Sequence, residues 1–511
     1  MWHSRNQDSK PNRVVVIGAG IGGLTSGALL ARRGYDVLVL DQAIVPGGCA
    51  STFKRRGFTF DVGATQVAGL EPGGIHHRIF QELAVELPNA SYCDPACAVC
   101  LPGETEAINV WRDAQKWKKE RQKQFPGSEP FWQLMAKLFQ ASWRFQSRDP
   151  ILPPRNSWDL WQLVTSVRPD TLITLPFTFM TVGDALRLYG LQDDRRLKTF
   201  LDLQLKLYSQ VNAEETALLY AATALGVSQA PLGLFHLEGS MQVLSDRLVE
   251  ALEKYGGKLL MRHTVEEIDT QSGKVTGVKI RNQKTGEVWT ETADHVVANV
   301  TVQNLVKLVT NPQSPLKNGY QRRVDKLPDA SGAFVIYLGV KQEAIPANCP
   351  PHLQFFYDYD GAIGENNSLF VSVSKPGDGR APEGYATVIA SSFTNARMWC
   401  RSSEENYQRL KQEYTQEAIA RLNGYFHLNS ETIIHQEAAT PRTFAHFTAR
   451  EDGIVGGIGQ RVSTFGPFGF ANRTPVQNLW LVGDSTHPGE GTAGVSYSAL
   501  TVVRQIENTL L

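Results

Sequence analysis

Residues 13–42, "RVVVIGAGIGGLTSGALLARRGYDVLVLDQ", decide the fold. The stretch opens with a β-branched run typical of a buried parallel strand. A glycine-rich turn then leads into helical spacing, and a second apolar run ends at Asp41, 23 residues after Gly18. The turn carries a GxGxxG pattern and one further glycine: Gly18, Gly20, Gly22 and Gly23. Strand, tight turn, helix, strand and acid in this order predict a Rossmann-like dinucleotide-binding domain.

Each part of this fingerprint has a physical task. Glycines let the backbone approach a pyrophosphate at the helix N-terminus, where free N–H groups and the helix dipole favour anions. The Asp41 carboxylate is suited to bind the ribose hydroxyls of the adenosine. Taken alone, the fingerprint leaves both NAD and FAD open.

The next stretch, "VPGGCASTFKRRGFTFDVGAT" at 45–65, narrows the choice. It places Gly47 and Gly48 after the acid and then a short alternating strand. This stretch resembles the flavin-dependent amine oxidase and phytoene desaturase superfamily, in which a similar glycine pair and strand wrap FAD. The resemblance implies FAD. Many relatives carry an arginine after the glycine pair where this chain has Cys49, and we expect Arg55 or Arg56, or the helix dipole and backbone alone, to compensate.

The last part of the chain contains "GDSTHPGEGTAG" at 483–494. A predicted strand at 479–482 puts Asp484 at its carboxyl end, where its carboxylate suits a ribityl hydroxyl of FAD. A helix is predicted from Ser496 to Leu511, and its N-terminal dipole would stabilise the negative charge of reduced flavin. A loop without bulk lets a flat ring lie against backbone. The residues expected to bind the cofactor here are Gly483, Asp484, Gly491, Thr492, Ala493 and Gly494.

The same resemblance extends through the middle of the chain. A helix is predicted at 241–254, followed by a strand reaching Val265, which matches the position that makes backbone contacts to the adenine in the family. We expect an α/β fold with a discontinuous Rossmann-like FAD-binding domain and an inserted α+β substrate-binding domain. The expected FAD-binding segments are 1–75, 231–310 and 436–511, and the expected substrate-binding segments are 76–230 and 311–435.

Residues 110–230 are expected to be partly helical and to touch a membrane. Six of the ten tryptophans fall between Trp111 and Trp161, beside a run of basic residues at 112–123. Residues 172–180 are wholly uncharged. Aromatic rings and long cations beside an apolar segment suit a membrane interface. Each feature also has an ordinary interpretation: core tryptophans, a solvated helix and a buried strand.

The closing motif, "HPGEGTAGVSYSAL" at 487–500, looks most like carotenoid desaturases of the bacterial type, within which cyanobacterial enzymes acting at the 3,4 position are the nearest group. The resemblance implies hydride transfer from a long apolar polyene to flavin N5, with an acceptor such as oxygen or a quinone. Glu490 and His487 are the titratable candidates for catalysis. Three alternatives stay open: a prolycopene cis–trans isomerase using reduced FAD, a carotenoid-binding flavoprotein without turnover, and an NAD-dependent dehydrogenase.

Composition limits the remaining possibilities. The 51 basic and 51 acidic side chains cancel, which gives no support for a nucleic-acid partner. Cys93, Cys97 and Cys100 match no zinc or iron–sulfur spacing, so no metal site is expected. The polar start at 1–13 lacks the apolar core of a signal peptide, which favours a cytoplasmic protein attached peripherally to a membrane.

Overall fold

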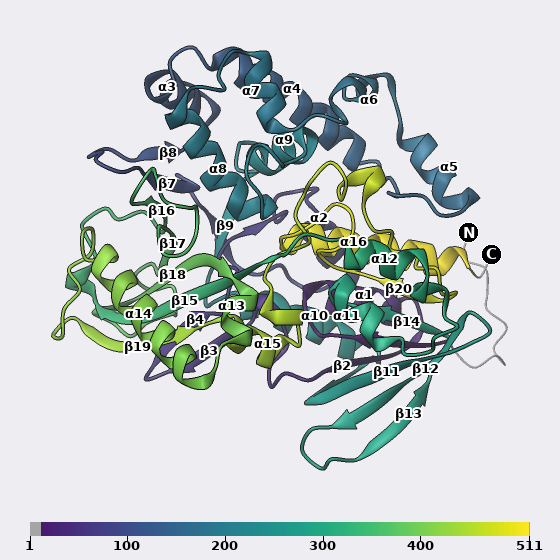
Figure 1. The fold of residues 1–511 in the computed structure, drawn as a ribbon. Helices are drawn as coiled ribbons and strands as arrows, with labels where there is room; N and C mark the ends of the chain where they lie inside the picture. The colour runs from purple at the N-terminus through teal and green to yellow at the C-terminus, as the bar shows by residue number, and fades with distance from the viewer. Residues whose placement is uncertain (1–11, 510–511) are drawn as a thin grey trace.

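A five-stranded parallel sheet lies at the centre of the fold, which the computed structural model describes for residues 12–509 (Figure 1). Its strands, in spatial order, are β10 (Lys258–Met261), β2 (Asp36–Asp41), β1 (Arg13–Ile17), β14 (His295–Ala298) and β20 (Leu479–Leu481). They come from all three segments expected to form the dinucleotide-binding domain. The predicted α/β, Rossmann-like architecture is therefore confirmed.

Strand β1 is buried on both faces. Val14 and Val16 pack in one core with the helices on one face of the sheet, and Val15 and Ile17 pack in another on the opposite face. The first core includes α1 (Ile21–Arg32), α10 (Gln242–Lys254) and α16 (Thr492–Asn508). The second includes the antiparallel strands β11 (His263–Gln271), β12 (Lys274–Asn282) and β13 (Val288–Thr292), and helix α11 (Val302–Leu308). Burial on two faces explains the unbroken β-branched run in the sequence.

A seven-stranded mixed sheet forms the second layer of the molecule. Its order is β19 (Ile433–Ala439), β15 (Ser331–Lys341), β18 (Tyr385–Asn395), β17 (Ser368–Val373), β16 (His352–Phe356), β7 (Cys97–Cys100) and β8 (Ile108–Val110). The expected boundary at 435 falls inside β19, which pairs with β15 in this sheet. Smaller sheets comprise β3 (Thr52–Arg55) with β4 (Phe58–Asp61), and β9 (Leu234–Leu237) between β5 (Val67–Ala68) and β6 (Ala90–Tyr92).

A helical region occupies the part of the chain where helices were expected, and it lies above both sheets in Figure 1. Its elements are α3 (Ala114–Gln124), α4 (Glu129–Gln146), α5 (Ser157–Ser166), α6 (Pro169–Leu172), η2 (Leu175–Phe177), α7 (Val182–Leu188), α8 (Arg195–Ser209) and α9 (Leu218–Gly226). The other helices of five or more residues are α2 (Ile75–Leu83), α12 (Gly319–Asp325), α13 (Ala396–Arg401), α14 (Glu404–Leu422) and α15 (Pro441–Thr448). Within residues 12–509, no helix is long and apolar enough to cross a membrane.

Several local expectations differ from the structure. The strand expected to reach Val265 breaks at Arg262, whose φ is +62°, and Val265 lies on β11 of another sheet. Helix α16 begins at Thr492, four residues before the expected Ser496, because Gly491 with φ +86° supplies its N-cap. The polar start that favoured a cytoplasmic location falls, up to residue 11, outside the described residues.

The features expected to meet a membrane do not lie together. Trp117 and Trp132 are buried with their ring centroids 5.7 Å apart, so they belong to a core. Helix α3, which carries the basic run, lies at the opposite end of the helical region from α5 and α6 (Figure 1). The segment at 172–180 is not a strand: it passes from α6 through η2, and Phe179 is 70% exposed.

Candidate functional site

A cavity of about 970 Å³ lies where the two ends of the chain meet, between the N-termini of α1 and α16. Both catalytic candidates, Glu490 and His487, line it. So do all but one of the residues expected to bind the cofactor: Gly18, Gly20, Gly22, Asp41, Gly47, Gly48, Val265, Gly483, Asp484, Gly491, Thr492, Ala493 and Gly494. The exception is Gly23, where a Cβ would lie 2.0 Å from the Gly18 carbonyl oxygen. Gly23 therefore permits close packing of α1 on the turn.

The glycine turn fits closely around Asn299 at the end of β14. A Cβ on Gly18, whose φ is +94°, would lie 2.6 Å from the Asn299 backbone oxygen. A Cβ on Gly20 would lie 2.8 Å from its Oδ1. The Asn299 amide donates to the Val482 carbonyl at 3.2 Å, so it joins the ends of β14 and β20. Only glycines leave space here for both this bridge and an approaching ligand.

Asp41 orders the same turn. Its Oδ2 accepts from the Ala19 amide and its Oδ1 from the Ala43 amide, each at 2.7 Å. Burial raises the pKa of the Asp41 carboxyl, and these two hydrogen bonds oppose that rise. Each carboxylate oxygen has a second acceptor position. The carboxylate can therefore shape the turn and still accept from ribose hydroxyls.

Arg450 is a functional candidate that the sequence analysis missed. It lines the cavity from the loop after α15, and its Nη2 donates to Oδ2 of Asp484 at 2.7 Å. Its Nε donates to the Ile454 carbonyl at 2.8 Å. Although burial opposes the charge, Asp484 and other nearby acids raise the pKa of Arg450. A permanent positive charge therefore sits in the wall of the cavity.

The expected substitute arginines lie elsewhere. Arg55 pairs with Glu437 at 3.2 Å and is half exposed, and neither Arg55 nor Arg56 lines the cavity. The charge of Arg450 instead acts on the Cys49 thiol, whose pKa burial raises and Arg450 lowers. An arginine from a distant segment thus reaches the place after the glycine pair where a cation was expected.

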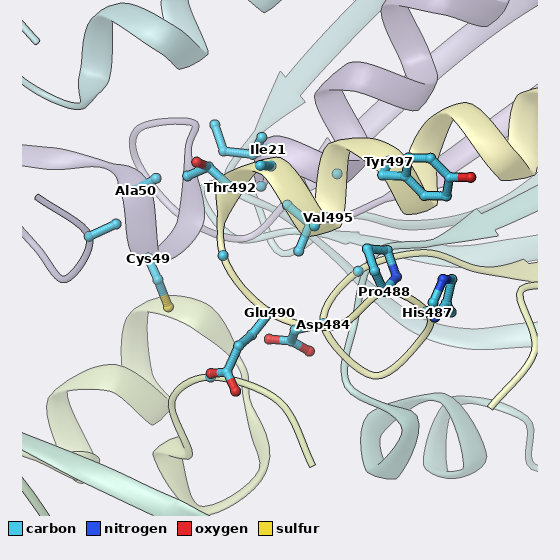
Figure 2. Close-up of a pocket in the computed structure, with 18 of the residues that line it drawn as sticks. Ile21, Cys49, Ala50, Asp484, His487, Pro488, Glu490, Thr492, Val495 and Tyr497 are labelled. Carbon is cyan, nitrogen blue, oxygen red and sulfur yellow. The ribbon is translucent and has the colours of Figure 1, made fainter. Parts of the chain in front are cut away.

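Glu490 is half-buried on the loop leading into α16, near Asp484 (Figure 2). Its Oε2 accepts from Nε2 of Gln210 at 2.8 Å, and its Oε1 is buried without a hydrogen-bond partner in the described part of the chain. Burial raises the pKa of Glu490 to about 8, and the Asp484 charge contributes to the rise. Such a carboxylate can accept a proton near neutral pH.

His487 lies on the other side of this loop, beside Tyr497 (Figure 2). Its Nε2 is 3.0 Å from Oε1 of Gln146 at the end of α4. Burial lowers the pKa of His487 to about 4, so the ring is neutral at physiological pH. Glu490 and His487 thus lie on different sides of the loop (Figure 2). The contact with Gln146 connects His487 to the helical region.

Beyond these groups the cavity becomes mainly apolar and reaches the helical region. Its lining there includes Leu152, Leu163, Val167, Leu175 and Leu219, and Phe393 of β18 adds to it from the seven-stranded sheet. Cys49 adds a half-buried thiol at the opposite end. The cavity therefore combines a glycine-lined end with acidic and basic groups and an apolar end, as in sites that hold a cofactor next to a substrate.

Comparisons with known proteins agree with this arrangement. The chain is 27% identical over 98% of its length to prolycopene isomerase 2, chloroplastic, from an Oncidium hybrid cultivar, and covers 84% of that protein. It is 24% identical over 97% of its length to a zeta-carotene-forming phytoene desaturase from Myxococcus xanthus, covering 93% of it. The fold matches an oxidoreductase from Methanosarcina mazei with a TM-score of 0.61 at 18% identity, covering 97% of this chain and all of the other.

A family match covers nearly the whole chain. Residues 21–507 match the family described as flavin containing amine oxidoreductase. The flavin in that description and the dinucleotide fingerprint at 13–42 together identify the cofactor as FAD, as the sequence resemblance implied. The chain belongs to the flavin-containing amine oxidoreductase family.

Proposed function

We propose that this protein is an FAD-dependent desaturase that introduces a carbon–carbon double bond, of the 3,4 type, into a carotenoid. Relatives named as phytoene desaturases are 24–26% identical over 96–97% of this chain, and the apolar end of the cavity suits a polyene. The chemistry that FAD supplies when bound is hydride acceptance, with later electron transfer to an acceptor such as oxygen or a quinone. The cavity residues bind the cofactor and exclude water.

The carboxylate of Glu490 in the cavity is the observation that best supports a desaturase reaction. Forming the double bond removes a hydride from one carbon and a proton from its neighbour, so the site needs a base. The unpartnered Oε1 of Glu490 is suited to take that proton, and Gln210 holds the other oxygen in place at 2.8 Å. His487, neutral and bonded to Gln146, positions the loop.

Asp484 and Arg450 would hold the cofactor beside this base. Asp484 is suited to a ribityl hydroxyl, and Arg450 supplies the positive charge that favours an anionic group near Cys49. Val265 and Asp41 line the same cavity and would hold the adenosine. The helix dipole of α16 favours negative charge at the loop from Gly491 to Gly494.

Isomerisation is the second candidate. Prolycopene isomerases from Oncidium hybrid cultivar, Daucus carota and Arabidopsis thaliana are 26–27% identical to this chain. Rotation about a polyene bond with reduced FAD needs no net proton removal. Glu490 would then be dispensable, which separates the two reactions experimentally.

We also propose that the substrate enters from a membrane surface at α5, α6 and η2. The same segments that line the apolar end of the cavity expose large apolar side chains: Leu160, Trp161, Val164, Leu172, Ile173, Leu175 and Phe179. Trp161 is 63% exposed, and such a patch marks an interaction surface. A carotenoid dissolved in the bilayer could pass from this patch into the cavity without crossing water.

Incubation of the FAD-loaded protein with vesicle-embedded carotenoids tests the reaction. The panel contains lycopene, a 1-hydroxylated carotenoid and poly-cis lycopene, and products are read by mass and absorbance. A red-shifted product lighter by two hydrogens supports the desaturase. A product of unchanged mass from the poly-cis compound establishes the isomerase instead.

A further inference from the structure

A second pocket of about 740 Å³ opens beside the exposed apolar patch. Phe179, which ends the patch, lines this pocket, and its ring centroid lies 5.5 Å from that of Phe468, which also lines it. Pro467 lines both this pocket and the main cavity. The pocket therefore lies next to the apolar end of the cavity.

The charged lining of this pocket is mostly positive. It holds the guanidinium groups of Arg155, Arg323 and Arg461 and one carboxylate, that of Glu215. Glu215 accepts from Nε of Arg461 at 2.8 Å. No other carboxylate of the residues that the structure describes lines the pocket, so the charges of Arg155 and Arg323 are not neutralised by its lining. Two positive charges are left in excess.

These two arginines differ in how firmly they are held. Arg323 is partly buried, donates to the Phe468 and Gly469 carbonyls, and stacks over the Phe470 ring at 4.0 Å. Arg155 is exposed, and its guanidinium has no hydrogen bond or ion pair within residues 12–509. Burial and the neighbouring charge of Arg155 lower the pKa of Arg323. Two like charges held near each other at a surface favour an anion between them.

We propose that Arg155 and Arg323 bind the headgroup phosphate of an anionic membrane phospholipid, whose acyl chains lie against Phe179 and Phe468. The excess positive charge disfavours the ammonium group of a zwitterionic headgroup and favours one with net negative charge, such as phosphatidylglycerol. A bound lipid would fix the molecule's orientation with the cavity facing the bilayer. This inference rests on the proposed membrane entry.

Vesicle co-sedimentation of the FAD-loaded protein tests the site. Phosphatidylcholine vesicles are compared with vesicles that also contain about 30% phosphatidylglycerol, which is expected to strengthen wild-type binding about tenfold. In Arg155→Gln the gain in binding from phosphatidylglycerol should be about fivefold smaller than in the wild type, while Arg155→Lys should keep most of the gain. Arg168→Gln is the matched control, because Arg168 is exposed beside the same patch but does not line the pocket. It should change binding less than about twofold.

Each other outcome has a definite meaning. Equal losses of vesicle binding in Arg155→Gln and Arg168→Gln would show that the protein's surface charge attracts anionic vesicles without a specific site, and would overturn the proposed site. Binding to phosphatidylcholine without any gain from phosphatidylglycerol would overturn the site and leave membrane entry standing. Binding to neither vesicle would overturn both. Calorimetry with a soluble short-chain phosphatidylglycerol and with inorganic phosphate separates the sources, and equal affinities would identify a free-phosphate site instead.

Discussion

Arg450 and Asp484 form an ion pair, 2.7 Å from Nη2 to Oδ2, that joins the loop after α15 to the carboxyl end of β20. Both residues line the cavity, and the charge of Arg450 also reaches the Cys49 thiol. The pair and its charge therefore connect the segments that contain Cys49, Arg450 and Asp484 at the glycine-lined end of the cavity. Arg450 thus supplies, through the tertiary fold, the positive charge that many relatives carry in an arginine at the position of Cys49.

Replacing Arg450 should weaken cofactor binding. In Arg450→Met the Asp484 carboxylate loses its partner in a mostly buried place, a change that costs about 3–5 kcal/mol in comparable pairs. We expect FAD affinity to fall by at least about tenfold, measured by flavin fluorescence on titrating FAD into the stripped protein. Arg55→Met is the control, because Arg55 is half exposed and outside the cavity. Loss of affinity in Arg55→Met alone would contradict the assignment.

Glu490 should set the pH dependence of turnover. Its pKa is raised to about 8, so the fraction of the basic form rises with pH through that value. The rate should therefore increase up to about pH 8 and level off above it, and Glu490→Gln should lower it about 100-fold and remove this dependence. His487→Gln should keep the same profile, because His487 is already neutral. An unchanged profile in Glu490→Gln would exclude this base.

Gly456 offers a test of the geometry around that carboxylate. Its φ is +68°, and a Cβ there would lie 2.4 Å from both Gln210 Nε2 and Glu490 Oε2. Gly456→Ala should break the hydrogen bond between them and lower turnover about tenfold or more. Gly190→Ala has a similar φ of +67°, meets no atom of residues 12–509 within 4 Å and does not line the cavity, so its effect reports backbone strain alone. Equal effects of both variants on turnover would mean that strain, not Glu490, is responsible.

A buried ion pair joins the loop between β17 and β18 to strands β4 and β9. Arg380 donates from Nη2 to Oδ2 of Asp61 at 3.1 Å and from Nη1 to the Leu237 carbonyl at 2.7 Å. Arg380→Met leaves a buried carboxylate unpaired and should lower the free energy of unfolding by about 3–5 kcal/mol. Arg397→Met breaks pairs of a half-exposed arginine with Asp329 and Asp452, each worth under about 1 kcal/mol. Urea unfolding measures the free energy of unfolding of both variants. Similar decreases in both would show that the buried pair of Arg380 stabilises the fold no more than an exposed pair does.

Local patterns predicted residues that the structure brings together around one cavity. The residues from Gly18 to Asp41 are contiguous, and each follows from a backbone requirement that sequence alone expresses. The same holds for the closing loop, although α16 begins four residues earlier than expected. Its first turn contains Thr492, Ala493 and Gly494, whose helical state depends on the cap at Gly491 more than on their own propensity.

Features that depend on tertiary contacts could not be predicted in this way. Arg450 stands in a loop without periodicity and becomes significant only because the fold brings it to Asp484 and Cys49. Trp117 and Trp132 looked like interface residues because composition does not distinguish a core from a surface. The exposed apolar side chains of α5 and η2 became evident only once their packing was known.

An anaerobic single-turnover experiment tests the central claim most directly. FAD-loaded protein is mixed with carotenoid-containing vesicles without oxygen or quinone, and flavin and carotenoid absorbance are followed together. The desaturase account predicts that oxidised flavin bleaches in step with a red shift of the carotenoid, one flavin for each new double bond. Conversion that begins only after prior flavin reduction, with no change in product mass, would contradict it and establish isomerisation.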